Sequence, residues 1–210
     1  MTLASPRSPR SRSAGDPPPV RLTVAQYHRM IEEQILEEDT AIELLDGRLV
    51  HKDRAAKGED PMTIGDQHVL VVKLLAALDA QVTRFGCHIQ TQQPIALPPF
   101  SEPEPDGALI IGTPRDYAGK PGASDVLAVI EVADSSLQRD RTTKLRIYAR
   151  AALPLYLIIN LSERCIEQYT RPLPKAARYG HTDTLTPKQT LTLPLPKKKS
   201  LKLPVASLLP

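Results

Sequence analysis

The stretch Asp125-Val-Leu-Ala-Val-Ile-Glu-Val-Ala-Asp134 decides the fold of this chain. Every residue from Val126 to Val132 is apolar except Glu131, and three of these seven residues are valines. A short run that is rich in β-branched residues and bounded by polar ones is typical of a strand buried on both faces. The sequence therefore predicts a core built around one central strand.

Glu131 is the exception in this apolar run, and its carboxylate needs a compensating partner. Side chains alternate along a strand, so each face takes every second residue. This predicts Leu127, Val129, Glu131 and Ala133 on one face, and Val126, Ala128, Ile130 and Val132 on the other. A buried carboxylate is costly to desolvate unless it is paired, protonated or bound to a cation. Another part of the chain must therefore compensate Glu131.

Length and composition favour one mixed α/β domain with tails. The chain has 210 residues, no tryptophan and two phenylalanines, so its core is aliphatic. Residues 1–19 are rich in Pro, Arg and Ser and are predicted to be disordered. Residues 20–196 are predicted to form a single domain, and residues 197–210 a lysine-containing tail.

Charge and cysteine content exclude some classes of protein. The two tails carry net charges of +2 and +4, so the total of +3 leaves −3 for residues 20–196. Basicity alone therefore does not indicate a nucleic-acid partner. Cys87 and Cys165 lack the spacing of a metal site and suit a reduced, cytoplasmic protein. No apolar run approaches the roughly 20 residues that cross a bilayer, and we expect no membrane partner.

The remaining elements are predicted from hydrophobic periodicity and from residues that cap helices or form turns. Helical spacing and a capping box predict a helix from Thr23, and Asp-Gly between apolar runs predicts a hairpin. The predicted elements are helices at 23–35, 66–85 and 136–152, a hairpin at 42–50, and strands at 88–97, 106–111, 155–160 and 164–170. The proline-rich remainder is predicted to be a loose edge or tail.

Two carboxylates and a lysine suggest a metal-dependent phosphodiester-hydrolysis site. Asp106 opens one buried strand and Glu131 lies late in the next, so pairing of these strands would bring both acids to one end of the sheet. Hard oxygen ligands of this kind suit Mg²⁺, with Mn²⁺ as a substitute. Lys144 lies one helical turn after Asp140, where its ammonium would approach the carboxylates. We therefore predict Asp106, Glu131 and Lys144 as catalytic, with Asp106 and Glu131 as the metal ligands.

Each of these residues has a simpler interpretation. Asp106 in Glu-Pro-Asp-Gly fits a turn, and Asp140 with Lys144 fits a surface ion pair. Glu43 fits the solvent side of an amphipathic strand, and His68 a surface histidine. Glu131 is the hardest to explain in this way, because its neighbours are core residues.

The order of these motifs resembles the Uma family of restriction endonucleases, in the PD-(D/E)XK nuclease superfamily. The resemblance covers about residues 22–170 and rests on motif order and strand context. The matching motifs are Glu43-Leu-Leu-Asp-Gly47, His68, Pro105-Asp106, Ile130-Glu-Val132, Asp134-Ser-Ser136, Asp140-x-x-x-Lys144-x-x-x-Tyr148 and Pro154-x-Tyr156. It implies a restriction-endonuclease-like α/β fold, a mixed central β-sheet flanked by helices, with the metal held at Asp106 and Glu131. Glu43, His68 and Asp140 are then expected at the rim of the site.

Departures from the superfamily pattern accompany the resemblance. In (D/E)-x-K the lysine follows two residues after the glutamate, where this chain has Ala133, and Lys144 on the next helix is expected to replace it. Asp134-Ser-Ser136 stands where Ser-Pro-Ser is favoured, and Ala152 where glycine is usual.

The sequence thus predicts a Mg²⁺-dependent endonuclease that hydrolyses DNA. Because cutting both strands of a duplex needs two sites, a homodimer would suit this activity. One alternative is a weakly active or inactive nuclease fold that binds nucleic acid or a protein partner. Another is a hydrolase of nucleotides built on the same site.

Overall fold

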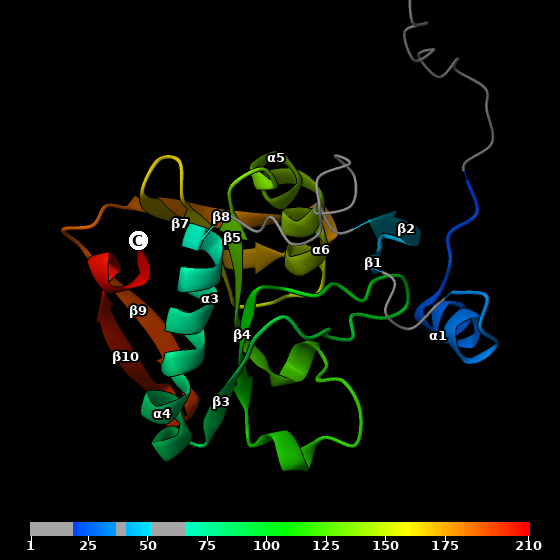
Figure 1. The fold of residues 1–210 in the computed structure, drawn as a ribbon, viewed down its shortest axis with the longest axis horizontal. Helices are drawn as coiled ribbons and strands as arrows, with labels where there is room; N and C mark the ends of the chain where they lie inside the picture. Colours follow the sequence, from blue (N-terminus) through cyan, green and yellow to red (C-terminus); the bar gives the residue numbers. More distant parts are fainter. Residues whose placement is uncertain (1–18, 37–40, 52–65) are drawn as a thin grey trace, which may run out of the picture.

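A computed structural model describes residues 19–36, 41–51 and 66–210 of the chain (Figure 1). Its centre is a six-stranded mixed sheet in the order β3-β4-β5-β6-β7-β8. Strands β5 and β6 are parallel, and all other neighbours in this sheet are antiparallel. The strands are β3 Cys87–Gln90, β4 Gly107–Ile111, β5 Val126–Ala133, β6 Leu155–Asn160, β7 Cys165–Leu173 and β8 Arg178–Leu185. The predicted fold class is confirmed.

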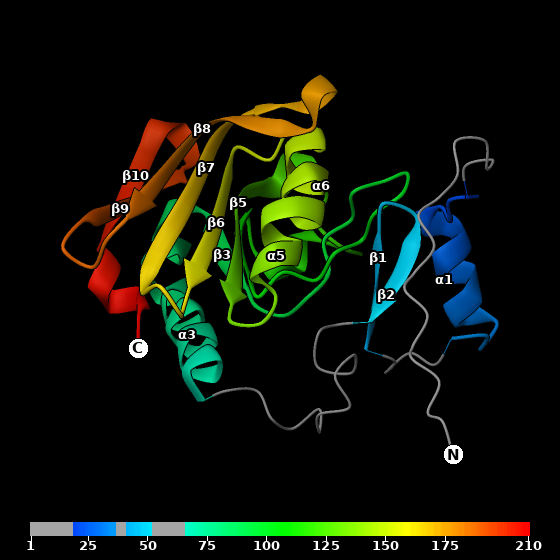
Figure 2. The same ribbon diagram turned by 90° about the horizontal axis from the view of Figure 1, so that it is seen from above.

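The two faces of the sheet are covered by different elements, as Figure 2 shows. Helix α3 (Asp66–Ala77), α4 (Asp79–Val82) and the hairpin of β9 (Thr190–Leu195) and β10 (Lys199–Pro204) pack on one face. Helix α6 (Leu145–Arg150), preceded by α5 (Leu137–Arg139), packs on the other. The central strand β5 is consequently buried on both sides, as its apolar sequence predicts.

The alternation predicted for β5 holds from Ala128 onward but not before it. Ala128, Ile130 and Val132 pack toward α3, whereas Val129 and Ala133 pack toward α6. The register with β4 shifts, so that Leu109 faces Ala128 while Ile110 faces Val126. Leu127 lies in this bulge, and the faces predicted for Val126 and Leu127 are therefore wrong.

A separate hairpin lies beyond α6, next to helix α1 (Val24–Glu32) (Figures 1 and 2). Strands β1 (Ile42–Leu45) and β2 (Arg48–His51) pair as predicted around Asp46-Gly47, both of which have positive φ. The capping box of Thr23 and Gln26 is also present. The hairpin joins the rest of the chain through the isolated bridge of Leu44 with Glu102.

The helix predicted at 136–152 is interrupted. Between α5 and α6 the backbone of Asp140–Lys144 forms a π-helical turn, and α6 ends at Arg150. Ala152, which stands at the position of the usual glycine, adopts a left-handed conformation with φ 60°. A left-handed residue ends the helix here, which explains the preference for glycine.

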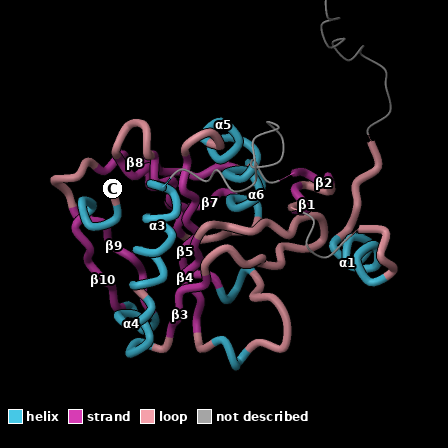
Figure 3. Tube along the Cα trace, viewed as in Figure 1, coloured by secondary structure: helices cyan, strands magenta, loops and turns pink. Residues whose placement is uncertain are grey.

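The C-terminal part differs most from prediction. Residues 197–210 are not a tail, because β10 pairs with β9 (Figure 3). Four of their side chains lie in the core: Leu203, Val205, Leu208 and Leu209. The region after residue 170 is likewise ordered as β8, β9 and β10 rather than a loose edge. The strand predicted at 88–97 ends at Gln90, since Gln92 has positive φ and Pro94 lacks an amide hydrogen. The prediction of disorder for residues 1–19 lies outside the described residues, except for the exposed Pro19.

The other short helical turns connect these elements. They are Thr83–Phe85, Pro114–Asp116, Ala123–Asp125, Pro174–Ala176, Pro196–Lys198 and Val205–Leu208. Among the described residues, the helices are too short or too polar to cross a membrane.

Candidate active site

Glu131 lies at the centre of a buried polar cluster between β5 and α6. Its side chain is 4% exposed. Tyr148 donates its hydroxyl to Oε1 at 2.6 Å, and Lys144 Nζ donates to Oε2 at 3.0 Å. Both partners come from the helical segment that follows β5, one turn apart. The compensation that the sequence demanded for Glu131 is thus provided by a cation and a phenol.

Asp106 directly precedes β4, next to the end of β5 that carries Glu131. Gly107 pairs with Ile130, so continuing the antiparallel register by one residue brings Asp106 opposite Glu131. The Asp106 carboxylate accepts a hydrogen bond from the Val132 amide at 2.8 Å, and His68 Nε2 lies 3.0 Å from its other oxygen. The predicted convergence of the two acids on one end of the sheet follows from this pairing.

Glu43 enters the cluster from the separate hairpin. It is buried, with Oε2 3.6 Å from Lys144 Nζ and accepting from the Glu104 amide at 3.1 Å. Its other oxygen lies 3.9 Å from the Arg139 guanidinium. Glu43 thus lies next to Lys144 inside the cluster, and the alternative of a solvent-facing position is wrong.

Asp140 completes the set from the π-helical turn. It is 1% exposed, and Ser136 donates its hydroxyl to Oδ2 at 2.6 Å. Its Oδ1 is buried and has no hydrogen-bond partner among the described residues. Lys144 is also buried, so the alternative of a solvated Asp140–Lys144 surface pair is wrong.

Access to the cluster is uneven. The side chains of His68 and Asp106 are 15% and 16% exposed, whereas those of Glu43, Glu131 and Lys144 are at most 5% exposed. The cluster therefore meets solvent on its Asp106 side. His68 lies on this side, where its Nε2 contacts Asp106, and it is not a free surface histidine.

The pKa values of Glu131 and Asp106 are shifted in opposite directions. Burial raises the pKa of Glu131, Lys144 opposes that, and Asp140, Asp106 and Glu43 add to the rise, leaving the pKa well above its usual range. Burial would also raise the pKa of Asp106, but the hydrogen bonds from His68 and Val132 outweigh it and lower the pKa. Asp106 is therefore the ionised member at neutral pH, and Glu131 binds a proton more readily.

Lys144 carries the positive charge of the cluster. Burial alone would lower its pKa, but the surrounding carboxylates, Glu131 first, raise it above the ordinary value. Asp140 has its pKa raised to about 6 because its carboxylate is buried. Four acids thus act on one buried ammonium, and the Arg139 guanidinium, 3.9 Å from Glu43, is a second cation at the cluster.

The donor set suits Mg²⁺ with substrate oxygens rather than a closed protein cage. No group of three or more His, Cys, Asp or Glu side chains has metal-binding geometry in the part of the chain that is described. Mg²⁺ commonly takes one or two carboxylates together with waters and phosphates. Asp106 and Glu131 fit that requirement, with Asp106 at the open side.

Sequence reasoning did not identify two further residues of the cluster. Tyr148 is part of the motif that carries the family resemblance but has no predicted role, although its position four residues after Lys144 indicates the same helix face. Arg139 lies next to Asp140 and reaches Glu43 and the carbonyl of His51, for which the sequence holds no signal.

A family model, Uma2, described as “Putative restriction endonuclease”, matches residues 24–206. The chain belongs to the Uma2 family. No curated protein matches this Uma2 chain. A crystal structure described as “a putative nuclease belonging to DUF820 from Anabaena variabilis ATCC 29413” matches with a TM-score of 0.63 and 16% identity, covering 89% of this chain and 97% of that one. At this identity the likeness shows the fold.

The migrated lysine of this Uma2 chain has a structural explanation. Ala133 lies two residues after Glu131 and is buried on the face of β5 that packs against α6. Lys144 reaches Glu131 from that same side. Lys144 on the helical segment thus contacts Glu131 from the side on which a lysine at position 133 of β5 would lie.

Proposed function

We propose that this Uma2 chain is a metal-dependent endonuclease that hydrolyses phosphodiester bonds of DNA, with Asp106, Glu131 and Lys144 as its catalytic residues. The observation that carries the proposal is the buried contact of Lys144 with Glu131, opposite Asp106 on the neighbouring strand. A buried ion pair is a poor means of stabilising a fold, and replacing one with apolar residues is often neutral or favourable. Its position at the solvent-facing end of the sheet supports a chemical role.

Asp106 and Glu131 would hold Mg²⁺ or Mn²⁺, which supplies Lewis-acid polarisation of the scissile phosphate when bound. Lys144 orients the attacking water and stabilises the negative charge that develops on the phosphoryl oxygens. Tyr148 fixes the rotamer of Glu131 through its 2.6 Å hydrogen bond. Glu43 holds Lys144 from the opposite side, at 3.6 Å.

Nicking of supercoiled plasmid tests the proposal. We expect cleavage with Mg²⁺ or Mn²⁺ and none in EDTA. Glu131→Gln should abolish cleavage while the chain stays folded, because Lys144 keeps Glu43 as a partner. Lys144→Met should also lower the rate of cleavage. Its matched control is Lys73→Met, which removes an exposed lysine of α3. Full activity in Glu131→Gln would refute the assignment, and sedimentation of the active form would test the predicted homodimer.

A second candidate is a nuclease fold that binds DNA or a protein without cutting. It is favoured by the hydrogen bonds that already occupy both oxygens of Asp106 and both oxygens of Glu131. Metal-independent DNA binding with no nicking under either metal would support this candidate. Calorimetric binding of Mn²⁺ that is lost in Glu131→Gln would argue against it.

A further inference from the structure

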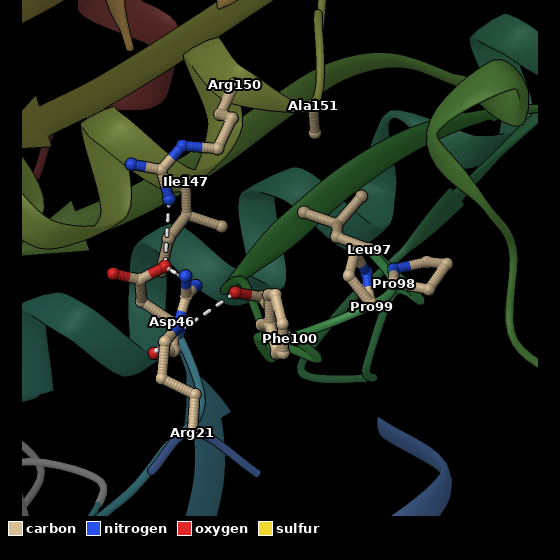
Figure 4. Close-up of a pocket in the computed structure, with 10 residues that line it drawn as sticks. Arg21, Asp46, Leu97, Pro98, Pro99, Phe100, Ile147, Arg150 and Ala151 are labelled. Carbon is tan, nitrogen blue, oxygen red and sulfur yellow. Dashed lines mark hydrogen bonds and ion pairs between the residues drawn. The ribbon is translucent and has the colours of Figure 1, made fainter. Parts of the chain in front are cut away.

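A cavity of about 280 Å³ lies beside α6, apart from the carboxylate cluster (Figure 4). One wall is apolar, and its rim carries two arginines and an aspartate. The lining consists of Arg21, Asp46, the segment 97–101, Ile147, Arg150 and Ala151. This volume is at the small end for a ligand site and suits part of a nucleotide rather than a whole cofactor.

Both arginines converge on one carboxylate. Arg150 Nη1 donates to Asp46 Oδ1 at 2.8 Å, and Arg21 binds the same oxygen while donating Nε to the Asp46 carbonyl at 3.0 Å. Figure 4 shows Asp46 lying between the two guanidinium groups. Two positive charges thus meet one negative charge, which leaves the rim with a net charge of +1.

The rim remains open to solvent. The side chains of Arg21, Asp46 and Arg150 are 38%, 36% and 44% exposed. Exposed ion pairs contribute little to stability because water screens them. An anion that accepts hydrogen bonds from both arginines can therefore replace the Asp46 carboxylate at a small cost in free energy. The Arg21 guanidinium also lies 4.0 Å from the centre of the Phe100 ring, which fixes its plane.

The same two elements build this rim and the carboxylate cluster. Arg150 follows Lys144 by six residues on one helical segment, which is about 9 Å along its axis. Asp46 follows Glu43 by three residues, in the turn directly after β1, which is at most about 10 Å. Both paths give a similar separation. A DNA strand rises about 3.4 Å per nucleotide, so the cavity lies about three nucleotides from the scissile position.

We infer that Arg21 and Arg150 form a second phosphate-binding subsite, which takes a backbone phosphodiester of the DNA strand held at the catalytic cluster. The inference rests on the proposed function for the identity of the substrate. Arginine suits this ligand because its planar guanidinium presents two parallel donors to a phosphate. The apolar wall of Leu97, Pro99 and Ile147 accommodates the sugar next to that phosphate. Asp46 occupies the arginines in the free protein and competes with the phosphate.

Two variants that should change the affinity for DNA in opposite directions test the subsite. Binding of a short fluorescein-labelled DNA duplex to the full chain is measured in EDTA by fluorescence anisotropy over a range of salt concentrations. Arg150→Gln should weaken binding about fivefold. It should also make the negative slope of log K against log salt less steep, by about 0.9. Asp46→Asn should strengthen binding by a similar factor, because it removes the competing charge.

Three further variants act as controls. Arg150→Lys keeps the charge but loses the paired donors, so it should retain the slope and part of the affinity. Arg84→Gln, in an exposed turn beside α4, should leave the affinity and slope unchanged. Thermal unfolding of each variant identifies any loss of folded protein, and Arg21→Gln provides a second removal of charge if Arg150→Gln unfolds.

The outcomes separate this inference from the proposed function. If Glu131→Gln abolishes cleavage while neither arginine variant changes affinity or slope, the subsite is wrong and the nuclease assignment stands. If nicking never occurs but the Asp46 and Arg150 variants shift binding in opposite directions, the subsite stands without the nuclease. A weaker affinity in Asp46→Asn would show a structural clamp and overturn the inference, as would a wild-type chain that does not bind DNA.

Discussion

Asp140→Asn tests the energetic cost of the acidic cluster. Asp140 is almost fully buried, and burial raises its pKa from 3.8 to about 6 despite the nearby Lys144. Below about pH 4 the carboxyl is protonated in both the folded and the unfolded chain and contributes nothing. Between about pH 4 and 6 the folded chain binds the proton more tightly, so stability falls as pH rises. Above about pH 6 the cost is constant.

The magnitude follows from the pKa. A rise from 3.8 to about 6 corresponds to about 3 kcal/mol, at 1.36 kcal/mol per pH unit. Asparagine does not ionise, so the variant avoids this cost. Its amide nitrogen would, however, take the place of an oxygen that has no hydrogen-bond partner among the described residues, at a cost of about 1 kcal/mol. We expect Asp140→Asn to be about 2 kcal/mol more stable than wild type above about pH 7, and about 1 kcal/mol less stable near pH 4.

Urea unfolding of both proteins, measured in EDTA across this pH range, gives the difference directly. EDTA removes any bound cation that would stabilise the ionised acid. Asp183→Asn, which changes an exposed aspartate on β8, is the control and should show no such crossing. A wild type that stays the more stable protein at neutral pH would refute the reasoning. It would show that Lys144 compensates Asp140 fully.

Three other changes have definite expected outcomes. Lys144→Met should lower the rate of plasmid nicking at saturating Mg²⁺ by about 100-fold or more, whereas a rate equal to that of Lys73→Met would exclude a catalytic ammonium. Ala152→Gly should raise the free energy of unfolding by about 1 kcal/mol, since φ is 60° there, and an unchanged urea midpoint would contradict the cost assigned to this conformation. A chain ending at residue 196 should fail to fold by circular dichroism, because it loses four buried apolar side chains worth about 1.5–3 kcal/mol each against a small net stability.

Much of the fold follows from local patterns in the sequence. The apolar run of β5 predicts a strand covered on both faces, and the alternation after Ala128 agrees with the packing. Asp46-Gly47 predicts the hairpin, because both residues tolerate the positive φ that the turn requires. The site was predictable for a related reason. A glutamate in an otherwise apolar strand needs a partner. The following helical segment offers Arg139, Arg141 and Lys144, of which Lys144 contacts Glu131.

The missed parts have physical causes. Prolines at 194 and 204 argue against strands, since proline cannot donate to a sheet, yet β9 and β10 pair only with each other and tolerate proline on their free sides. The bulge at Leu127 depends on its pairing with β4, which a single strand's sequence does not encode. The π-helical turn of Asp140–Lys144, which carries two buried charged residues, has no signal in local helix propensity.

The position of the lysine shows how the sheet and the helix share one role. A lysine at position 133 would extend from β5 into the space against α6, where Tyr148 and Lys144 already contact Glu131. Ala133 is 1% exposed, so a second long side chain would have to displace this packing. The small residue on the strand and the lysine on the helix are therefore alternatives to a lysine on the strand. The π-helical turn lies in the same segment, and both Asp140 and Lys144, at its two ends, are buried. A chain that moves its lysine to the helix thus needs both a small residue after the glutamate and a helix that turns its charged residues inward.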